Sequence, residues 1–328
     1  MDKKIFLKSL TGKNASLLLK TVFKLNKAFY MEKDKIAIYP GCSLETSSSH
    51  YLKSLRTVFS VLDIPFRVIK DWNCCGATSV KSIDQNLNML LNHKNLALAE
   101  EQGIKELVVP CASCYHRLAD AKYTLNKDEK LRTELNGKNN FHYKGQVKVR
   151  NILDFFVNVV GLDIISKNVK KPLSGLTVAC YYGCLNTRVP LEQSFDTREY
   201  PMTMDMIVKA LGAKTIDWSY KTDCCGASLF ITVNTIAEKL VGKILKDASL
   251  RGVDCVTVSC PMCQTNLDTK QKSIRSKNSI EQPLPVPFIT QLMGLAFGCK
   301  PKDLGLNKNF VPVKSILSSC SVVKNEDE

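Results

Sequence analysis

Ten of the fourteen cysteines in this chain fall into two sets of five, with the same order and similar spacing in each set. Each set has a single cysteine, then a Cys-Cys-Gly triplet, then a Cys-x-x-Cys pair. The first set is Cys42, Cys74, Cys75, Cys111 and Cys114, and the second is Cys184, Cys224, Cys225, Cys260 and Cys263. In a reducing compartment, cysteine at this density binds metal or does redox chemistry more often than it forms structural disulfides. The repeat predicts two equivalent metal centres.

The number of cysteines in each set limits the kind of metal. A structural zinc ion takes four ligands, and an ordinary four-iron cubane also takes four cysteines. Each set offers five, so either one cysteine is a spectator in both sets or the cluster is not an ordinary cubane. We favour iron–sulfur clusters. Zinc in one or both halves is the alternative, and it predicts a colourless protein without iron.

We expect short buried strands to position these cysteines. Apolar runs at 36–39 and 177–179 predict strands that end near the first cysteine of each set, and runs at 107–109 and 256–258 predict strands that lead to the Cys-x-x-Cys pairs. Adjacent strand residues point to opposite faces, so a Cys-Cys pair serves one cluster only where the chain turns. Gly76 and Gly226 supply the freedom in φ for that turn. A helix that begins at each Cys-x-x-Cys pair would favour thiolates.

The elements between the cysteines predict an α/β fold made of two pseudo-symmetric, duplicated units packed together. The clearest helix covers 237–248, where apolar residues recur at i, i+3 and i+4, with Gly252 just past its end. We expect an exposed loop or linker at about 127–145. A second polar stretch at 270–282 leads into a last apolar helix at about 288–297.

The overall composition excludes several classes of protein. No apolar run in the 328 residues is long enough to span a bilayer, and we expect a cytoplasmic protein. The net charge of +15 raises nucleic acid as a partner, but no basic run is interleaved with aromatic residues that would stack on bases. We therefore expect no nucleic-acid binding, and part of the basic excess would offset cluster-bound thiolates.

Four cysteines lie outside the sets. Cys180 and Cys255 fall in predicted buried strands, while Cys299 and Cys320 have no partner in the repeat. Buried cysteine behaves as a small hydrophobic residue, so packing is the expected role of all four. Cys180 is the strongest candidate for an exception, because it lies close to Cys184 in the sequence.

Three other side chains could assist chemistry at the two sets. Arg188 and Lys221 lie near cysteines of the second set and could place positive charge beside an anionic ligand. His116 follows the first Cys-x-x-Cys pair and could give a proton to a leaving thiolate. Side chains of these types are more often ordinary surface groups.

The motifs Cys42-x31-Cys74-Cys75-x35-Cys111-x2-Cys114 and Cys184-x39-Cys224-Cys225-x34-Cys260-x2-Cys263 resemble the paired CCG domains of the B subunit of heterodisulfide reductase. The resemblance covers about 36–312. It implies that all five cysteines of each domain hold a noncubane [4Fe–4S] cluster, and that a disulfide or thiol substrate is reduced or formed in one-electron steps between the two clusters. It also implies a ferredoxin-like iron–sulfur partner (C-type) and a flavin partner (A-type).

Two functions follow from this resemblance. The first is a catalytic thiol–disulfide oxidoreductase subunit, which the two complete motifs favour. The second is an electron-relay subunit of a succinate-, lactate- or glycolate-type dehydrogenase complex. The identity of the disulfide and the direction of electron flow do not follow from the sequence.

The repeat also suggests domain boundaries. We expect a basic N-terminal extension at 1–35, a first CCG domain at 36–150, a second at 151–300 and a tail at 301–328. The extension carries nine lysines against three acidic residues, with an apolar stripe from Leu18 to Phe29. It could dock on a partner protein, lie on an anionic membrane surface as a peripheral contact through 1–30, or pack as an ordinary helix.

Overall fold

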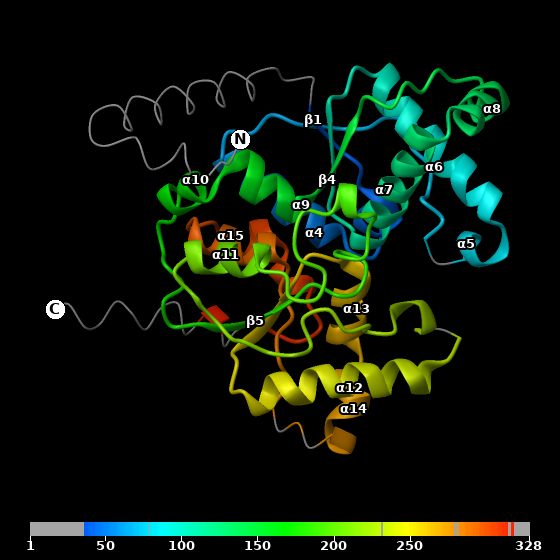
Figure 1. Ribbon diagram of the computed structural model, residues 1–328. Coiled ribbons are helices and arrows are strands. Elements are labelled where there is room, and N and C mark those ends of the chain that lie inside the picture. The colour runs from blue at the N-terminus through cyan, green and yellow to red at the C-terminus, as the bar shows by residue number, and fades with distance from the viewer. Residues whose placement is uncertain are drawn as a thin grey trace, which may run out of the picture.

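The computed structural model describes residues 36–77, 79–230, 232–278, 280, 282–313 and 316–317 (Figure 1). The N-terminal extension and Cys320 lie outside the described residues, so the expectations for them stay predictions. Two parallel sheets, one in each half of the chain, form the framework. This confirms the α/β fold with two duplicated units.

The first sheet has the strand order β2-β1-β3-β4, with every neighbouring pair parallel. The strands are β1 (Ile36–Ile38), β2 (Arg67–Val68), β3 (Glu106–Val109) and β4 (Lys148–Asn151). The helices are α3 (Gly41–Glu45), α4 (Ser49–Val61), α5 (Val80–Ile83), α6 (Gln85–Glu101), α7 (Ala112–Lys127) and α8 (Glu129–Asn139). All residues of β1 and β3 are buried, as expected of parallel strands covered on both faces.

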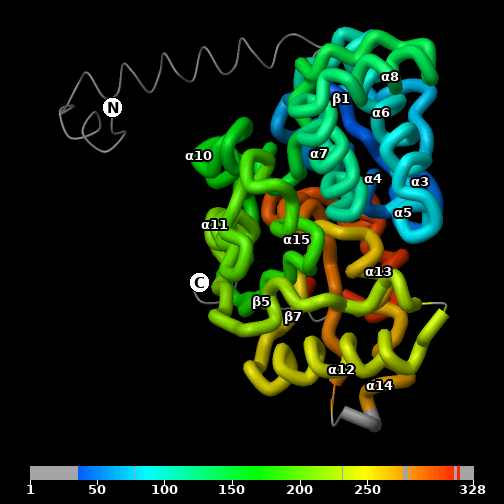
Figure 2. Tube along the Cα trace, turned by 45° about the vertical axis from the view of Figure 1, so that its right-hand side comes forward, coloured from blue at the N-terminus to red at the C-terminus, as the bar shows by residue number. Residues whose placement is uncertain are grey.

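The second sheet has the order β6-β5-β7 and is also parallel. Its strands are β5 (Thr177–Tyr181), β6 (Lys214–Thr215) and β7 (Cys255–Val258), and a parallel bridge joins Val258 to Phe288. The helices around it are α11 (Thr203–Ala210), α12 (Asn234–Leu250), α13 (Pro261–Thr269), α14 (Gln271–Asn278) and α15 (Ile289–Ala296). In Figure 2, α12 and α14 lie side by side on the outside of this half.

Short helical segments complete the chain. They are α9 (Ile152–Asp154), the π-helix η1 (Phe155–Val160), α10 (Leu162–Lys167) and the 3-10 helices η2 (Leu191–Gln193), η3 (Ala227–Leu229), η4 (Pro301–Leu304) and η5 (Leu306–Lys308). η1 packs Phe155 beside Phe59 of α4, with the ring centroids 5.5 Å apart. This contact covers the face of the first sheet that α4 occupies.

The four predicted strands and the two predicted apolar helices, now α12 and α15, are confirmed. The loop expected at 127–145 is wrong, because α8 occupies much of it. The carboxylate of Asp128 caps this helix by accepting a hydrogen bond from the Leu131 amide at 2.8 Å. Leu131 and Leu135 lie one turn apart and face inward, and this short apolar stripe is enough to seat an otherwise polar helix.

Both apolar cores of the molecule include residues from both halves. One core lies where α4, η1, α11 and α15 meet, and it joins Val58 and Phe59 to Met204 and Leu292. The other covers the opposite faces of the sheets under α6, α7, α12 and α13. The two duplicated units therefore share their interior.

Candidate metal centre

Each cysteine set lies where strands end and helices begin. Cys42 lies in α3, two residues after the Tyr39–Pro40 segment that follows β1. Cys111 is the N-cap of α7 and Cys260 is the N-cap of α13, so Cys114 and Cys263 fall in the first turns of these helices. The predicted strand-to-helix position of both Cys-x-x-Cys pairs is confirmed. Free helix amides and the partial positive charge of a helix N-terminus favour thiolates at such positions.

The chain turns at both Cys-Cys pairs, as predicted. Gly76 has φ +68° and Gly226 has φ +71°, a conformation that residues with a side chain rarely adopt. The Gly76 amide lies 3.5 Å from the Cys74 sulfur, and the Gly226 amide lies 3.3 Å from the Cys224 sulfur. The turns allow both sulfurs of each pair to approach one centre.

The five sulfurs of the first set contact one another in a chain. Cys75 and Cys114 have their sulfurs 3.3 Å apart. Hydrogen bonds also join Cys42 to Cys74, Cys74 to Cys75 and Cys111 to Cys114. In the second set Cys225 and Cys263 lie 3.6 Å apart, and further hydrogen bonds join Cys184 to Cys224 and Cys260 to Cys263. The structure brings the members of each set together.

In each set these contacts stabilise one exposed cysteine as the thiolate and raise the pKa of the partner that donates to it. The hydrogen bond from the Cys42 thiol lowers the pKa of Cys74 to about 2. The hydrogen bond from Cys184, helped by the nearby charge of Arg188, lowers the pKa of Cys224 to about 6. Thiolate is the form of cysteine that binds metal. Each set therefore has the chemistry of a metal ligand group.

A glycine before the first cysteine makes room for the sulfurs in each half. A Cβ on Gly41 would lie 2.8 Å from the Cys114 sulfur, and a Cβ on Gly183 would lie 2.9 Å from the Cys263 sulfur. Both glycines also have positive φ, +64° and +68°. The sequence repeat Tyr-x-Gly-Cys carries the signal for this cradle, but pattern alone does not reveal that the glycine touches the Cys-x-x-Cys pair.

A tyrosine three residues before the first cysteine braces the Cys-Cys turn in each half. The Tyr39 hydroxyl donates to the Asn73 carbonyl at 2.6 Å, and the Tyr181 hydroxyl donates to the Asp223 carbonyl at 2.5 Å. Tyr39 therefore corresponds to Tyr181. Both accepting carbonyls belong to the residue just before the Cys-Cys pair.

The two sets meet at the interface of the halves. The Cys111 thiol donates a hydrogen bond to the Cys260 sulfur, and this contact lowers the pKa of Cys260 well below its usual value. Next to it, the Ser113 hydroxyl lies 3.4 Å from the Met262 sulfur. The first turns of α7 and α13 thus face each other across the interface.

The donor set fits a polynuclear cluster better than a single ion. Within the part of the chain that the structure describes, no three His, Cys, Asp or Glu side chains are arranged to hold one metal ion. The five sulfurs of the first set instead form an extended chain of contacts, and those of the second set form two groups, Cys184 with Cys224 and Cys225 with Cys263 and Cys260. Iron–sulfur clusters are bound by such cysteine thiolates, so the residues present fit a cluster in each half.

A small cavity of about 70 Å³ lies between the halves and opens onto the second set. Ala77, Ala112 and Ser113 of the first half line it together with cysteines of the second set, Leu185 and Met262. Its described lining carries no charged side chain. The cavity suits a small apolar group next to the cysteine sulfurs.

Arg188 and His116, two of the three proposed assisting residues, lie near this interface. Arg188 is exposed, and its charge reaches Cys224. His116 is half-buried and hydrogen-bonded to the backbone of Arg188, and burial lowers its pKa. Its neighbour Arg117, which the sequence did not single out, has its guanidinium 3.5 Å from the Ala77 carbonyl. Through its hydrogen bond to the Arg188 backbone, His116 links α7 to the loop that carries Cys184.

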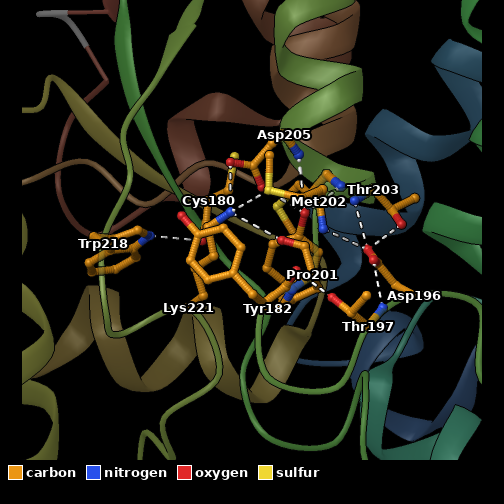
Figure 3. Close-up of polar contacts among 12 residues, drawn as sticks. Cys180, Tyr182, Asp196, Thr197, Pro201, Met202, Thr203, Asp205, Trp218 and Lys221 are labelled. Carbon is orange, nitrogen blue, oxygen red and sulfur yellow. Dashed lines mark hydrogen bonds and ion pairs between the residues drawn. The ribbon is translucent and has the colours of Figure 1, made fainter.

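Lys221 is buried, so the expectation that it is a surface charge is wrong. Its side chain is 1% exposed, and its ammonium donates to the Asp205 carboxylate at 2.9 Å and to the Pro201 carbonyl at 3.1 Å. Asp205 also accepts from the Tyr182 hydroxyl at 2.7 Å (Figure 3). This network ties α11 to the segments that carry Cys184 and Cys224, and the ion pair occupies the Lys221 ammonium.

Three of the four cysteines outside the sets lie in the part of the chain that the structure describes. Cys180 and Cys255 are fully buried in the second sheet, as the packing prediction requires. Cys180 is also hydrogen-bonded to Asp205, and burial raises its pKa well above its usual value. Cys299 is half-buried. The packing roles of Cys180 and Cys255 are consistent with their surroundings.

The fold and the cysteine arrangement match known proteins. The cysteine-rich CCG domain model matches this chain twice, over residues 36–119 and 178–268. Over 86% of its length, the chain is 34% identical to the 8-methylmenaquinol:fumarate reductase membrane anchor subunit of Wolinella succinogenes, covering 98% of that protein. A solved structure of a hypothetical protein from Helicobacter pylori has the same fold, with a TM-score of 0.66 at 15% identity. The match covers 85% of this chain and 52% of the chain in that structure.

Archaeal relatives carry the name that the motifs suggest. The chain is 30% identical to the B subunit of a ferredoxin/F420H2-dependent CoB–CoM heterodisulfide reductase from Methanosarcina acetivorans, over 84% of this chain and 94% of the relative. It is 27% identical to a protein of Archaeoglobus profundus that is named for its likeness to the same B subunit, over 82% of this chain and 93% of the relative. The chain therefore belongs to the CCG cysteine-rich domain family, among the relatives of the heterodisulfide reductase B subunit, and it carries two copies of the domain.

Proposed function

We propose that this chain is an electron-transferring iron–sulfur subunit of a membrane-bound, quinone-linked reductase complex. In this proposal the five cysteines of each set hold one [4Fe–4S] cluster of the noncubane type. The similarity to a component of an 8-methylmenaquinol:fumarate reductase supports the type of complex, because the identity is 34% and the match covers 98% of that relative. Among the described residues no helix is long and apolar enough to cross a bilayer, so the membrane contact would come from a partner protein or from residues 1–30.

The meeting of the first turns of α7 and α13 is the observation that carries this proposal, since the Ser113 hydroxyl lies 3.4 Å from the Met262 sulfur beside the contact of Cys111 with Cys260. It places the ligand groups of the two halves against each other, and electron transfer is faster the closer two centres lie. When bound, the clusters supply one-electron transfer. Cys42, Cys74 and Cys224 reach the molecular surface, so each set is accessible to a neighbouring protein. In this proposal the chain holds the two clusters close together and leaves each cluster accessible to a partner protein.

The proposed partners are those that the resemblance to the heterodisulfide reductase B subunit implies. A ferredoxin-like protein and a flavin protein of the same complex would exchange electrons with the exposed cysteines and carry the substrate chemistry. The basic composition, with a net charge of +15, favours acidic partner surfaces. Arg188 and Arg117 beside the cysteine loops would contribute to such docking.

Disulfide cleavage is the second candidate function, and the cavity between the halves favours it. A disulfide in that cavity would lie against cysteines of the second set and against Ala77 and Ala112 of the first half. None of the described residues that line the cavity has a charged side chain to bind an anionic substrate. Lys221 does not supply one, because its ammonium is paired with Asp205. His116, near the Arg188 backbone, would be the proton donor to a leaving thiolate.

The anaerobically purified complex separates the two functions. We expect iron and acid-labile sulfide in the wild-type complex, and loss of quinol-linked fumarate reduction in the Cys225→Ser variant. That variant should keep fumarate reduction by an artificial dye that donates directly to the flavin partner. Cys299→Ser is the control, because Cys299 lies outside both sets, and it should behave as wild type.

Other outcomes of the same measurements would overturn the proposal. Full quinol-linked activity in Cys225→Ser, with loss of disulfide reduction instead, would establish the second candidate. Zinc in place of iron in the wild-type complex would exclude both.

A further inference from the structure

One tyrosine hydroxyl touches the turns that carry both Cys-x-x-Cys pairs. Tyr51 belongs to α4 in the first half and is fully buried. Its hydroxyl lies 3.0 Å from the Ser259 carbonyl and 3.5 Å from the Pro110 carbonyl. Ser259 directly precedes Cys260, and Pro110 directly precedes Cys111. The hydroxyl therefore bridges the starts of α7 and α13 at the place where the two sulfur sets meet.

The ring of Tyr51 is clamped by the second half. It stacks on Phe288 with the ring centroids 4.0 Å apart and the planes 4° from parallel. Phe288 is bridged to Val258, at the end of the strand that leads to Cys260. On the helix side, the Ser54 hydroxyl donates to the Tyr51 carbonyl at 2.9 Å and lies 2.6 Å from the Thr290 hydroxyl of α15. Both the ring and the backbone of Tyr51 are thus fixed relative to the second half.

Ser259 is held from its other side as well. Its hydroxyl accepts a hydrogen bond from the Asn186 amide at 3.1 Å, and the Asn151 amide donates to the Asn186 side-chain oxygen at 2.8 Å. Asn151 ends β4 and pairs with Val109, the residue before Pro110. All of these side chains are buried. The hydrogen bonds therefore close a ring through both halves, from Pro110 through Tyr51, Ser259, Asn186 and Asn151 back to β3.

We propose that Tyr51 is a positioning residue whose hydroxyl fixes the spacing between the two cysteine sets. The inference rests on the proposed function, since the spacing matters only if each set holds a cluster. Without the hydroxyl, two buried carbonyls at the starts of α7 and α13 lose their shared donor, and buried carbonyls without partners are unfavourable. The turns would then separate or become heterogeneous, while the cysteines of each set keep their own contacts.

Tyr51→Phe removes only the hydroxyl and keeps the ring on Phe288. We expect both clusters to load, as measured by iron and acid-labile sulfide per chain. In the fully reduced complex we expect loss of the resolved magnetic interaction between the two clusters by paramagnetic resonance, together with slower electron exchange between them. Tyr143→Phe is the matched control, because Tyr143 is also buried and its hydroxyl has no hydrogen-bond partner among the described residues. It should retain the wild-type interaction.

A second variant and the iron content make the test decisive. Asn186→Ala loosens the opposite side of Ser259, and it should weaken the magnetic interaction in the same direction as Tyr51→Phe. A wild-type interaction in Tyr51→Phe overturns the positioning role. Loss of iron from Tyr51→Phe alone also overturns it, since the residue would then serve cluster assembly. Wild-type protein without iron would instead overturn the proposed function.

Discussion

Gly41 and Gly183 occupy the same position in the two halves, one residue before the first cysteine of each set. Each has positive φ, and each leaves room for a sulfur of the Cys-x-x-Cys pair, 2.8 Å and 2.9 Å from the place a Cβ would take. Two costs therefore act on any side chain there: backbone strain and displacement of a sulfur of the proposed cluster site. The second cost concerns metal binding directly.

Gly41→Ala should lower the iron content of the first site while the second site stays loaded. The added methyl group would push the Cys114 sulfur away from Cys75, which it contacts at 3.3 Å. Iron per chain, measured on anaerobically purified protein, should fall to about half, because only one of two equivalent sites is affected. The matched control is Gly103→Ala. Gly103 also has positive φ, +71°, but nothing lies within 4 Å of the position that its Cβ would take. Equal iron in the two variants would show that the sulfur contact is unimportant.

At this scale the sequence predicts the ligands but not their environment. The ten cysteines are recognisable because two sets of five recur in the same order and at similar spacing. The contact between Cys111 and Cys260 depends on how two distant segments pack, and no local pattern encodes it. The burial of Lys221 is similar, because its partner Asp205 lies on α11, which is separate from the segment that carries Lys221.

The elements around the second set are tied together by the ion pair of Lys221 with Asp205. Through it α11 is joined to the segment before Cys224, and the Lys221 carbonyl accepts hydrogen bonds from the Tyr182 and Gly183 amides at 2.8 Å and 3.1 Å. At the corresponding place in the first half, the exposed Asp71 stands three residues before Cys74. The two duplicated units therefore differ at this place.

Lys221→Met should destabilise the protein by about 3 kcal/mol, because it leaves the buried Asp205 carboxylate without its cation. Replacing Asp205 as well, in the double variant Lys221→Met/Asp205→Leu, should recover part of this loss. The guanidinium midpoint, followed by circular dichroism, measures both. Arg251→Met is the control, since its ion pair with Asp247 is solvent-exposed and should matter little. A single variant as stable as wild type would mean that the pair does not brace the loop.

Helix prediction at the element scale succeeded where an apolar stripe is long. The stripe of α12 extends over several turns, and its limits follow from the periodicity and Gly252. α8 has only Leu131 and Leu135 to face inward, and its many polar residues look like a loop. The Asp128 cap and the packing against α6 and α7 fix this helix, and only the folded structure shows that packing.

At the scale of the whole molecule, the duplication is plain in the sequence but the joining of the halves is not. Each half builds its own parallel sheet and gathers its own set of cysteine sulfurs. Each apolar core nevertheless combines residues of both halves. Hydrophobic periodicity shows which face of a strand or helix is buried. It does not show whether that face packs within its own unit or against the duplicate unit.

Separate expression of residues 1–171 and 172–328 tests how far the halves depend on each other. Alone, the first fragment would expose Val58, Phe59 and Phe155, and the second would expose Met204 and Leu292, which now meet in one core. Exposed apolar patches of this kind favour aggregation. We therefore expect each fragment alone to be insoluble or free of iron, and co-expression to restore a soluble protein loaded at both sites, as measured by iron content. A soluble first fragment that carries its own cluster would mean that each CCG unit is an independent domain, joined to its duplicate only at the surface.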